Sequence, residues 1–325
     1  MAATDLSDSL VAAFHRSRIT VVVPHHNLSE FLADALISVQ QQSHRNFSCI
    51  LVDDASEKEH ASHARNVIEG LDDPRFRFVQ APANRGMVHA IYRGIDEAPA
   101  AFTCVLDPDD RYAPEFLERM LAVHLNRVAF AALACCDQYL LQIGDGVITG
   151  TERTNGLETF ATGADAAEQE CFRSCGFHRF VTPLEAGWHW SSTSSMMFRT
   201  EALRLIRPGK ELAYKGQGDD YCANGAHMLG GSLLLREPLV YRGLHDRNDF
   251  ISRHVMSMWQ RRQRDGAVPM SAIAKIDVVE AFFDNDGLRY FDPLNIREVL
   301  LAQFDGDELE RLKAAVPAAR ALLSN

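Results

Sequence analysis

Two spacings of hydrophobic residues alternate over the first 125 residues. Short apolar runs that suit buried strands lie at residues 19–23, 47–52 and 101–106, and residues 75–79 predict a further short strand. Between them, apolar residues recur every three or four positions, which predicts helices at residues 32–39, 57–69, 87–95 and 116–125. Strands that alternate with helices of this length predict an α/β fold with a doubly wound, mostly parallel sheet.

The pattern changes after residue 126. Residues 128–143 predict a strand that enters a hairpin, with Asp145-Gly146 as its turn. Residues 150–187 show little periodicity and predict a long loop with helical pieces. Beyond this loop we expect helices at residues 200–206 and 219–229, one or two strands within residues 232–241, and a mainly helical C-terminal appendage from residue 248 onward.

Composition and charge narrow the classes of protein. The 325 residues suffice for one large domain with an appendage, and the formal net charge of −11 argues against nucleic-acid binding. No run reaches the roughly 18 apolar residues that span a bilayer, so we expect no transmembrane segment. Peripheral contact with the inner face of a membrane remains compatible with this sequence. The seven cysteines show no paired spacing, and the N-terminus lacks the basic-then-apolar order of residues that a secretory signal has. Both observations predict a cytoplasmic protein with reduced thiols.

Polar side chains gather where three of the predicted strands end. Residues 24–27 follow the first strand, Asp53 and Asp54 end the second, and residues 107–110 follow the fourth. Doubly wound sheets bind their ligands beyond the carboxyl ends of the strands. We therefore expect these three clusters to form one site.

The sequence Asp107-Pro108-Asp109-Asp110 offers oxygen ligands for a metal ion. Alternate carboxylates at a strand end share a face, so Asp107 and Asp109 can converge. Hard oxygen ligands suit Mg²⁺ or Mn²⁺, and a site of this kind keeps positions for substrate phosphates and water. The alternative interpretation is a plain turn, because Asp and Pro favour turns.

Five further candidates also have structural alternatives. Asp54 can accept hydrogen bonds from a base or ribose, or it can cap a helix. Asp219 and Asp220 lie at the start of a predicted helix, where a carboxylate can act as a general base or as a cap. Arg242 can neutralise phosphate, and His245 follows the same predicted strand, although either can simply be a strand-end residue.

Together these segments resemble the family 2 glycosyltransferases of GT-A fold. The resemblance is dense over residues 19–126 and sparse from there to residue 248. The matching segments are VVVPHHN at 21–27 for V-I-I-P-x-Y-N, SVQQQS at 38–43 for S-V-L-x-Q-T, LVDDAS at 51–56 for V-D-D-G-S, NRG at 84–86 for N-x-G, LDPDD at 106–110 for L-D-A-D-D, GDD at 218–220 for G-E-D, and YRGLH at 241–245 for Y-R-x-H with one inserted residue.

The resemblance implies an inverting transfer of a sugar from a UDP-, GDP- or dTDP-sugar to a hydroxyl of a glycan or lipid-linked acceptor. Its common setting is polysaccharide, lipopolysaccharide or other glycoconjugate synthesis. It implies Mn²⁺ or Mg²⁺ held by Asp109, Asp107 and His245, and Asp220 as the catalytic base with Asp219 as the alternative. The residues that it assigns to donor binding are Pro24, His26, Asn27, Asp54, Arg85, Gly86, Asp107 and Arg242.

On this interpretation the chain divides into four parts, and residues 150–187 are a candidate for a mobile loop over the donor. The parts are an N-terminal extension at residues 1–18, a nucleotide-sugar-binding half at 19–126, an acceptor-binding half at 127–248, and a C-terminal helical region at 249–325.

Two rival interpretations are weighed against it. A sugar-phosphate nucleotidyltransferase is expected to carry a loop rich in Gly and Lys or Arg after its first strand, where this chain has Pro24-His25-His26-Asn27. A non-catalytic nucleotide-sugar-binding module of the same fold would not need acidic residues at both 107–110 and 219–220. We therefore favour the glycosyltransferase.

Overall fold

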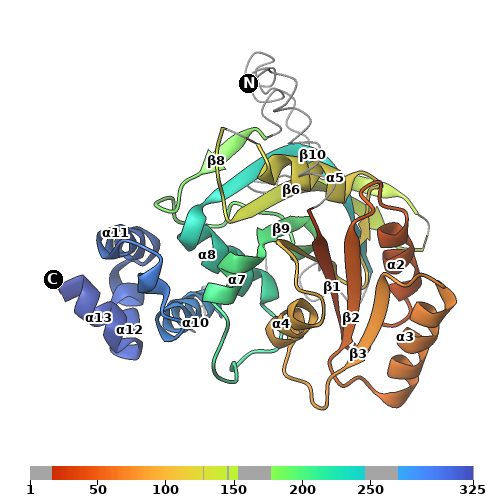
Figure 1. Ribbon diagram of the computed structural model, residues 1–325, viewed down its shortest axis with the longest axis horizontal. Helices are drawn as coiled ribbons and strands as arrows, with labels where there is room; N and C mark the ends of the chain where they lie inside the picture. The colour runs from red at the N-terminus through yellow and green to blue at the C-terminus, as the bar shows by residue number, and fades with distance from the viewer. Residues whose placement is uncertain (1–16, 127, 145, 153–176, 246–269, 325) are drawn as a thin grey trace, which may run out of the picture.

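Ten strands form one sheet in this computed structural model, which describes residues 17–126, 128–144, 146–152, 177–245 and 270–324 (Figure 1). Across the sheet the order is β3 (Phe76–Gln80), β2 (Phe47–Asp53), β1 (Ile19–His25), β4 (Phe102–Val105), β9 (Met196–Arg199), β6 (Leu133–Gln142), β10 (Ser232–Leu244) and β5 (Arg111–Tyr112). At the side, β7 (Ile148–Glu152) pairs with β6 and β8 (Arg179–Val181) pairs with β10.

Most of the strands run in one direction. The neighbours β3, β2, β1 and β4 are parallel to one another. Strand β9 is antiparallel to both β4 and β6, so β6 has the direction of β4, and β10 is parallel to β6. Six of the ten strands therefore share a direction, which confirms the predicted mostly parallel α/β sheet.

Helices cover both faces of the sheet, as the apolar runs require (Figure 1). One face packs against α2 (Leu32–Gln40), α3 (Lys58–Gly70) and α5 (Phe116–His124), and the other against α4 (Met87–Glu97), α7 (Thr200–Leu205) and α8 (Gly218–Gly230). Successive residues of β1 alternate between the two cores: Val21 and Val23 pack with α2, whereas Val22 packs with Ala90 of α4. This alternation explains why β1 has no polar face.

The strand expected at residues 128–143 begins five residues later, at Leu133. Val128 and Phe130 are apolar but remain 69% and 75% exposed, so the hydrophobic run starts before the buried strand does. The hairpin is present, because β6 pairs antiparallel with β7. Its expected turn residue Asp145 lies outside the described residues, as do residues 153–176 of the expected loop.

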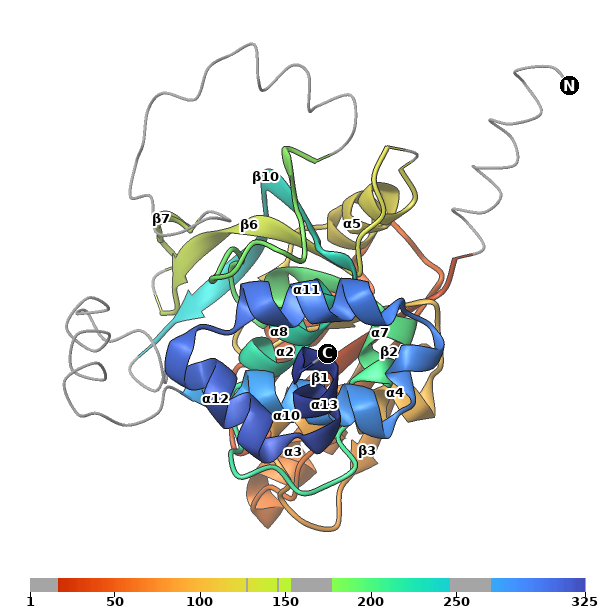
Figure 2. The ribbon, with the colours of Figure 1, turned by 90° about the vertical axis from the view of Figure 1, so that its left-hand side faces the viewer.

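The C-terminal helices are α10 (Met270–Asp284), α11 (Pro293–Gln303), α12 (Gly306–Ala315) and α13 (Pro317–Ser324), with a short 3-10 turn at Gly287–Arg289. They lie together beyond α8, and Figure 2 shows them in front of the sheet. Ala274 and Val278 of α10 share one hydrophobic cluster with Tyr221 of α8. The predicted appendage is therefore helical and is joined to the sheet through α8.

Among the helices described, none is long and apolar enough to cross a membrane. The five cysteines in the same part of the chain are free and buried.

Candidate active site

A cleft of about 360 Å³ opens where β1, β2 and β4 end. Because these strands are parallel, the residues that follow them meet at one edge of the sheet. Two further segments complete the walls of the cleft: the turn before α4, and residues 215–219, which lead into α8. The predicted site residues that line it are Pro24, His26, Asp54, Gly86, Asp107, Asp109, Asp219 and Arg242.

Acidic side chains crowd one wall of this cleft. The pKa of Asp107 is raised well above its usual range, first by desolvation and then by the charges of Asp110, Asp109 and Asp219. Burial and the charge of Asp109 likewise raise the pKa of Asp110 to about 7. Arg242 opposes both shifts, and it lines the same cleft. The site thus concentrates negative charge against one guanidinium, which favours a bound cation.

Asp109 and His245, which the sequence assigns to the metal, meet directly. His245 Nε2 lies 2.9 Å from Asp109 Oδ2. The imidazole of His245 also stacks on Phe31, with 4.4 Å between ring centroids. The residue inserted before His245 therefore does not move this histidine away from the acidic turn.

The donor set fits a hard divalent ion only in part. Carboxylate oxygens are the ligands that Mg²⁺ and Mn²⁺ prefer, and the crowding of Asp107, Asp109 and Asp110 would be relieved by such an ion. Within the described part of the chain, however, no group of three or more His, Cys, Asp or Glu side chains is arranged to hold a metal. The chain therefore offers an incomplete coordination sphere, as expected where phosphates and water supply the rest.

Asp110 ties the acidic turn to β10. Its Oδ1 accepts a hydrogen bond of 2.9 Å from the Gly243 amide, and its side chain is buried. A Cβ at Gly243 would lie 2.1 Å from the Asp109 carbonyl oxygen, so only glycine allows this approach. The third aspartate of the turn is therefore an anchor for the other two.

We expect Gly243→Ala to destabilise the protein by about 1–3 kcal/mol, because the added methyl group must push the backbone at Asp109 away from β10. Urea denaturation measures the change. Gly70→Ala is the matched control, since a Cβ at Gly70 meets no atom within 4 Å. Equal unfolding midpoints for the two variants would contradict the close approach of Gly243 to Asp109.

Asp54 fixes the turn that precedes α4. Its Oδ1 accepts from the Arg85 amide at 3.0 Å and its Oδ2 from the Gly86 amide at 2.6 Å. Gly86 has a φ of +88°, and a Cβ there would lie 2.6 Å from Lys215 Cα. Asp54 therefore binds the backbone of this turn and caps neither neighbouring helix, since the N-caps of α3 and α4 are Glu57 and Gly86.

Besides His245, which lies beside Asp109, three of the expected site residues do not line the cleft. Asn27 Oδ1 accepts from the Glu57 amide at 2.9 Å, at the N-terminus of α3. Arg85 pairs with Glu211 at 2.8 Å, and both side chains are about half exposed. The third, Asp220, is considered next.

The two aspartates at the start of α8 face different surroundings. Asp219 lines the cleft, adds to the charge felt by Asp107, and accepts from the Asp220 amide at 2.9 Å. Asp220 is half-buried, and its charge contributes to the raised pKa of Tyr214, which burial and Asp277 chiefly cause. The charge of Asp219 therefore acts on the acidic turn, and that of Asp220 acts on Tyr214.

Sequence reasoning missed several residues in and around the cleft. His25 Nδ1 lies 3.0 Å from Asp53 Oδ1 in a fully buried pair, and hydrogen bonds from His25 and Ser56 lower the pKa of Asp53 although burial opposes them. Ser194 Oγ accepts from the Asp107 amide at 3.0 Å, and Lys215 Nζ donates to the Asn84 carbonyl at 2.6 Å. Only the His25–Asp53 pair had a sequence signal, namely that both residues end neighbouring strands.

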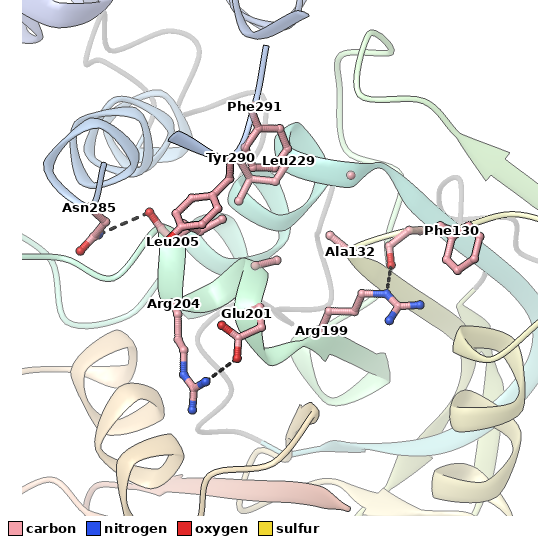
Figure 3. Close-up of a pocket in the computed structure, with 13 residues that line it drawn as sticks. Phe130, Ala132, Arg199, Glu201, Arg204, Leu205, Leu229, Asn285, Tyr290 and Phe291 are labelled. Atoms are coloured by element: carbon pink, nitrogen blue, oxygen red, sulfur yellow. Dashed lines mark hydrogen bonds and ion pairs between the residues drawn. The ribbon is translucent and has the colours of Figure 1, made fainter. Parts of the chain in front are cut away.

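A larger cavity of about 710 Å³ lies between α7, α8 and the C-terminal helices (Figure 3). Its polar side chains have partners inside the protein: Arg204 pairs with Glu201, Arg199 Nε donates to the Ala131 carbonyl at 3.0 Å, and Asn285 Nδ2 donates to the Leu205 carbonyl at 3.3 Å. Phe130, Tyr290 and Phe291 also line it. None of the predicted site residues is among those that line this cavity in the described structure, so we assign the site to the smaller cleft.

Comparison with known proteins shows which family part of the chain resembles. Residues 20–153 match the model of Glycosyl transferase family 2. An uncharacterized glycosyltransferase of Nostoc sp. is 22% identical over 262 residues, which are 78% of this chain and 73% of that protein. The putative teichuronic acid biosynthesis glycosyltransferase TuaG of Bacillus subtilis is 27% identical over 111 residues, or 34% of this chain and 42% of TuaG.

The fold has a solved counterpart. The structure of S. aureus TarS 1-349 in complex with UDP-GlcNAc superimposes with a TM-score of 0.50 at 16% identity, over 94% of this chain and 88% of TarS 1-349. The chain therefore has the GT-A fold, and its residues 20–153 match the model of glycosyl transferase family 2. The resemblance found in the sequence is confirmed.

Proposed function

We propose that the protein is a metal-dependent, inverting glycosyltransferase that uses a nucleotide-diphosphate sugar. One observation carries the proposal: Asp107, Asp109 and Arg242 share a cleft with Asp219, which comes from a distant part of the chain. Such a cleft offers a cation site for a diphosphate beside a carboxylate for an acceptor hydroxyl. The relative named for teichuronic acid biosynthesis supports synthesis of a polysaccharide or another glycoconjugate, on a glycan or lipid-linked acceptor.

On the donor side, His26 and Asp54 line the same cleft and are proposed to hold the nucleoside. Pro24 and Gly86 shape its walls, and Gly86 cannot be replaced without a clash at Lys215. Arg242 faces Asp107 and Asp110 and is placed to neutralise phosphate oxygens. Asn27 and Arg85 stay predictions for this role, because neither lines the cleft.

A divalent ion, Mn²⁺ or Mg²⁺, would supply positive charge that stabilises the departing diphosphate. Asp109, Asp107 and His245 are proposed to hold it. Their part is supported by the 2.9 Å contact of His245 with Asp109 and by the raised pKa of Asp107, which desolvation and the neighbouring carboxylates cause.

The base is proposed to be one of the two aspartates that begin α8. Asp219 is favoured by its place in the cleft lining. Asp220 is favoured by its match to the last residue of the family's G-E-D element. In either case the acceptor oxygen forms a bond to the anomeric carbon, its proton passes to the carboxylate, and the bond from the anomeric carbon to the diphosphate breaks.

Such a single displacement inverts the anomeric centre. We therefore expect an α-linked nucleotide-hexose to give a β-linked product, because the hydroxyl attacks the face opposite the leaving group. The anomeric proton coupling of the product in an NMR spectrum measures this for a suitable hexose. Retention of configuration would rule out a single base-assisted displacement.

The proposed function is tested by the products that the protein releases. Incubation with a panel of UDP-, GDP- and dTDP-sugars and Mn²⁺ should release a nucleoside diphosphate from at least one of them. A sugar-phosphate nucleotidyltransferase would instead release pyrophosphate from a nucleoside triphosphate and a sugar phosphate. Release of neither would favour the non-catalytic module.

A further inference from the structure

The connecting segment between α7 and α8, residues 207–217, links two parts of the molecule. It passes between α4 and α10 in Figure 1. Its last three residues, Lys215, Gly216 and Gln217, line the proposed donor cleft. Whatever holds this segment in place therefore also holds one wall of the cleft.

On the side of the cleft, the connecting segment is fixed to the turn before α4. The Lys215 carbonyl accepts a hydrogen bond from the Met87 amide at 2.7 Å, and Lys215 Nζ donates to the Asn84 carbonyl at 2.6 Å. Gln217 has a φ of +58°, a left-handed conformation that is uncommon outside glycine. Such a backbone persists only where its surroundings hold it, so this wall of the cleft depends on the position of the whole segment.

On the other side, the connecting segment is fixed to the C-terminal helices. Lys210 Nζ lies 2.8 Å from Asp277 Oδ1 of α10, and Lys210 also pairs with Glu280, one turn further along the same helix. Leu212 and Tyr214 are buried in a hydrophobic cluster that includes residues of α10. The C-terminal helices, whose described residues do not line the cleft, therefore contact its wall through this segment.

Asp277 is the buried member of this contact, with 8% of its surface exposed. Partial burial works against a charged Lys210, yet hydrogen bonds to Asp277 and Glu280 raise the pKa of its ammonium group. Burial, and then the charge of Asp277, raises the pKa of Tyr214. Because a buried carboxylate costs free energy unless it is paired, Asp277 favours the position of the segment that keeps Lys210 beside it.

We infer that Asp277 is a positioning residue for the donor cleft, and that it acts through Lys210 on the segment that carries Lys215 and Gln217. The C-terminal helical region then takes part in donor binding without touching the donor. The inference rests on the proposed function, since it concerns a wall of the cleft that is assigned to the donor.

Calorimetric titration with UDP, GDP and dTDP in the presence of Mn²⁺ tests the inference. Asp277→Asn keeps the size of the side chain and removes the charge that attracts Lys210. We expect its affinity for the nucleotide that binds the wild type most tightly to fall roughly three- to tenfold, within the range of coupling between contacting groups. Lys210→Met should lose affinity to a similar extent, whereas Lys210→Arg, which keeps the cation, should bind nearly as the wild type does.

The double variant Asp277→Asn/Lys210→Met separates positioning through Lys210 from a general loss of stability. Both single changes break the same contact, so the double variant should bind the nucleotide no more weakly than either single variant. Two independent losses of stability would instead add.

Glu308→Gln is the matched control. Lys275 Nζ of α10 lies 2.7 Å from Glu308 Oε2 of α12, and 15% and 27% of the two side chains are exposed. This ion pair joins two of the C-terminal helices to each other, and neither residue lines the cleft. The variant should therefore bind the nucleotide as the wild type does, even where its urea unfolding midpoint is lower.

Three results would overturn the inference and leave the proposed function standing. They are wild-type affinity in Asp277→Asn, an equal loss of affinity in Glu308→Gln, and a double variant in which the two single losses add. If none of the three nucleotides binds the wild-type protein, the proposed function and the inference fall together.

Discussion

Sugar transfer should fall by about a hundredfold or more when the catalytic carboxylate at the start of α8 is changed to asparagine, the usual scale for loss of general-base catalysis. Asparagine keeps the size of the side chain and removes its basicity. Asp219→Asn and Asp220→Asn are the two variants to compare, because the aspartates are adjacent and both half-buried. Single-turnover transfer and calorimetric donor titration should be measured on each.

The two readouts separate the roles of these residues. The base variant should lose transfer while it keeps donor affinity within a few fold, because the base acts on the acceptor proton. The charge of Asp219 acts on Asp107, so Asp219→Asn should shift donor affinity in metal only within these few fold, whereas Asp220→Asn should leave it unchanged. If both variants transfer sugar at the wild-type rate, the base lies elsewhere and our interpretation of Gly218-Asp219-Asp220 is wrong.

Removal of the metal should abolish donor turnover. Asp107 and Asp109 are proposed to share the ion with the diphosphate, so excess chelator takes away the charge that stabilises the leaving group. Asp109→Asn should weaken donor binding in Mn²⁺ by roughly tenfold or more, the scale of a lost interaction with a charged group. Calorimetric titration with and without metal measures the effect.

Asp72→Asn is the control for the Asp109 variant. Asp72 is exposed, and asparagine tolerates its φ of +47° well. This variant removes the same charge at a distant site and should bind the donor as the wild type does. Full turnover in excess chelator would remove the metal from the mechanism.

The sheet could be predicted from the sequence because its central strands carry apolar residues on both faces. Val21, Val22 and Val23 are all buried, since helices cover both faces of β1. The same rule misplaced the start of β6, because Val128 and Phe130 are apolar yet exposed. An apolar run thus predicts a buried strand only where tertiary packing covers it.

The acidic part of the site could also be predicted, for a topological reason. Asp54 follows β2 and Asp107 follows β4, and both of these strands are parallel to β1, which lies between them. Residues that follow parallel strands reach the same edge of the sheet. His245 joins them because β10 continues in the same direction and ends beside Asp109.

The remaining cleft residues come from contacts that no local pattern contains. Lys215 lies in a segment without periodicity and packs on the turn at Gly86, 129 residues earlier in the chain (215 − 86). Ser194 reaches the Asp107 amide from the short 3-10 turn at Thr193–Ser195. Arg85 matches a family segment, but its side chain pairs with Glu211 and does not line the cleft, so its role in donor binding stays a prediction.

The central claim, that this cleft binds a nucleotide sugar through a divalent ion, is tested most directly by thermal unfolding with a panel of nucleotide sugars. Ligand binding to the folded state raises the unfolding midpoint by mass action. We expect at least one UDP-, GDP- or dTDP-sugar to raise the midpoint in Mn²⁺, and the rise to vanish in excess chelator and in Asp109→Asn. No rise with any nucleotide sugar, or an equal rise in chelator, would contradict the account.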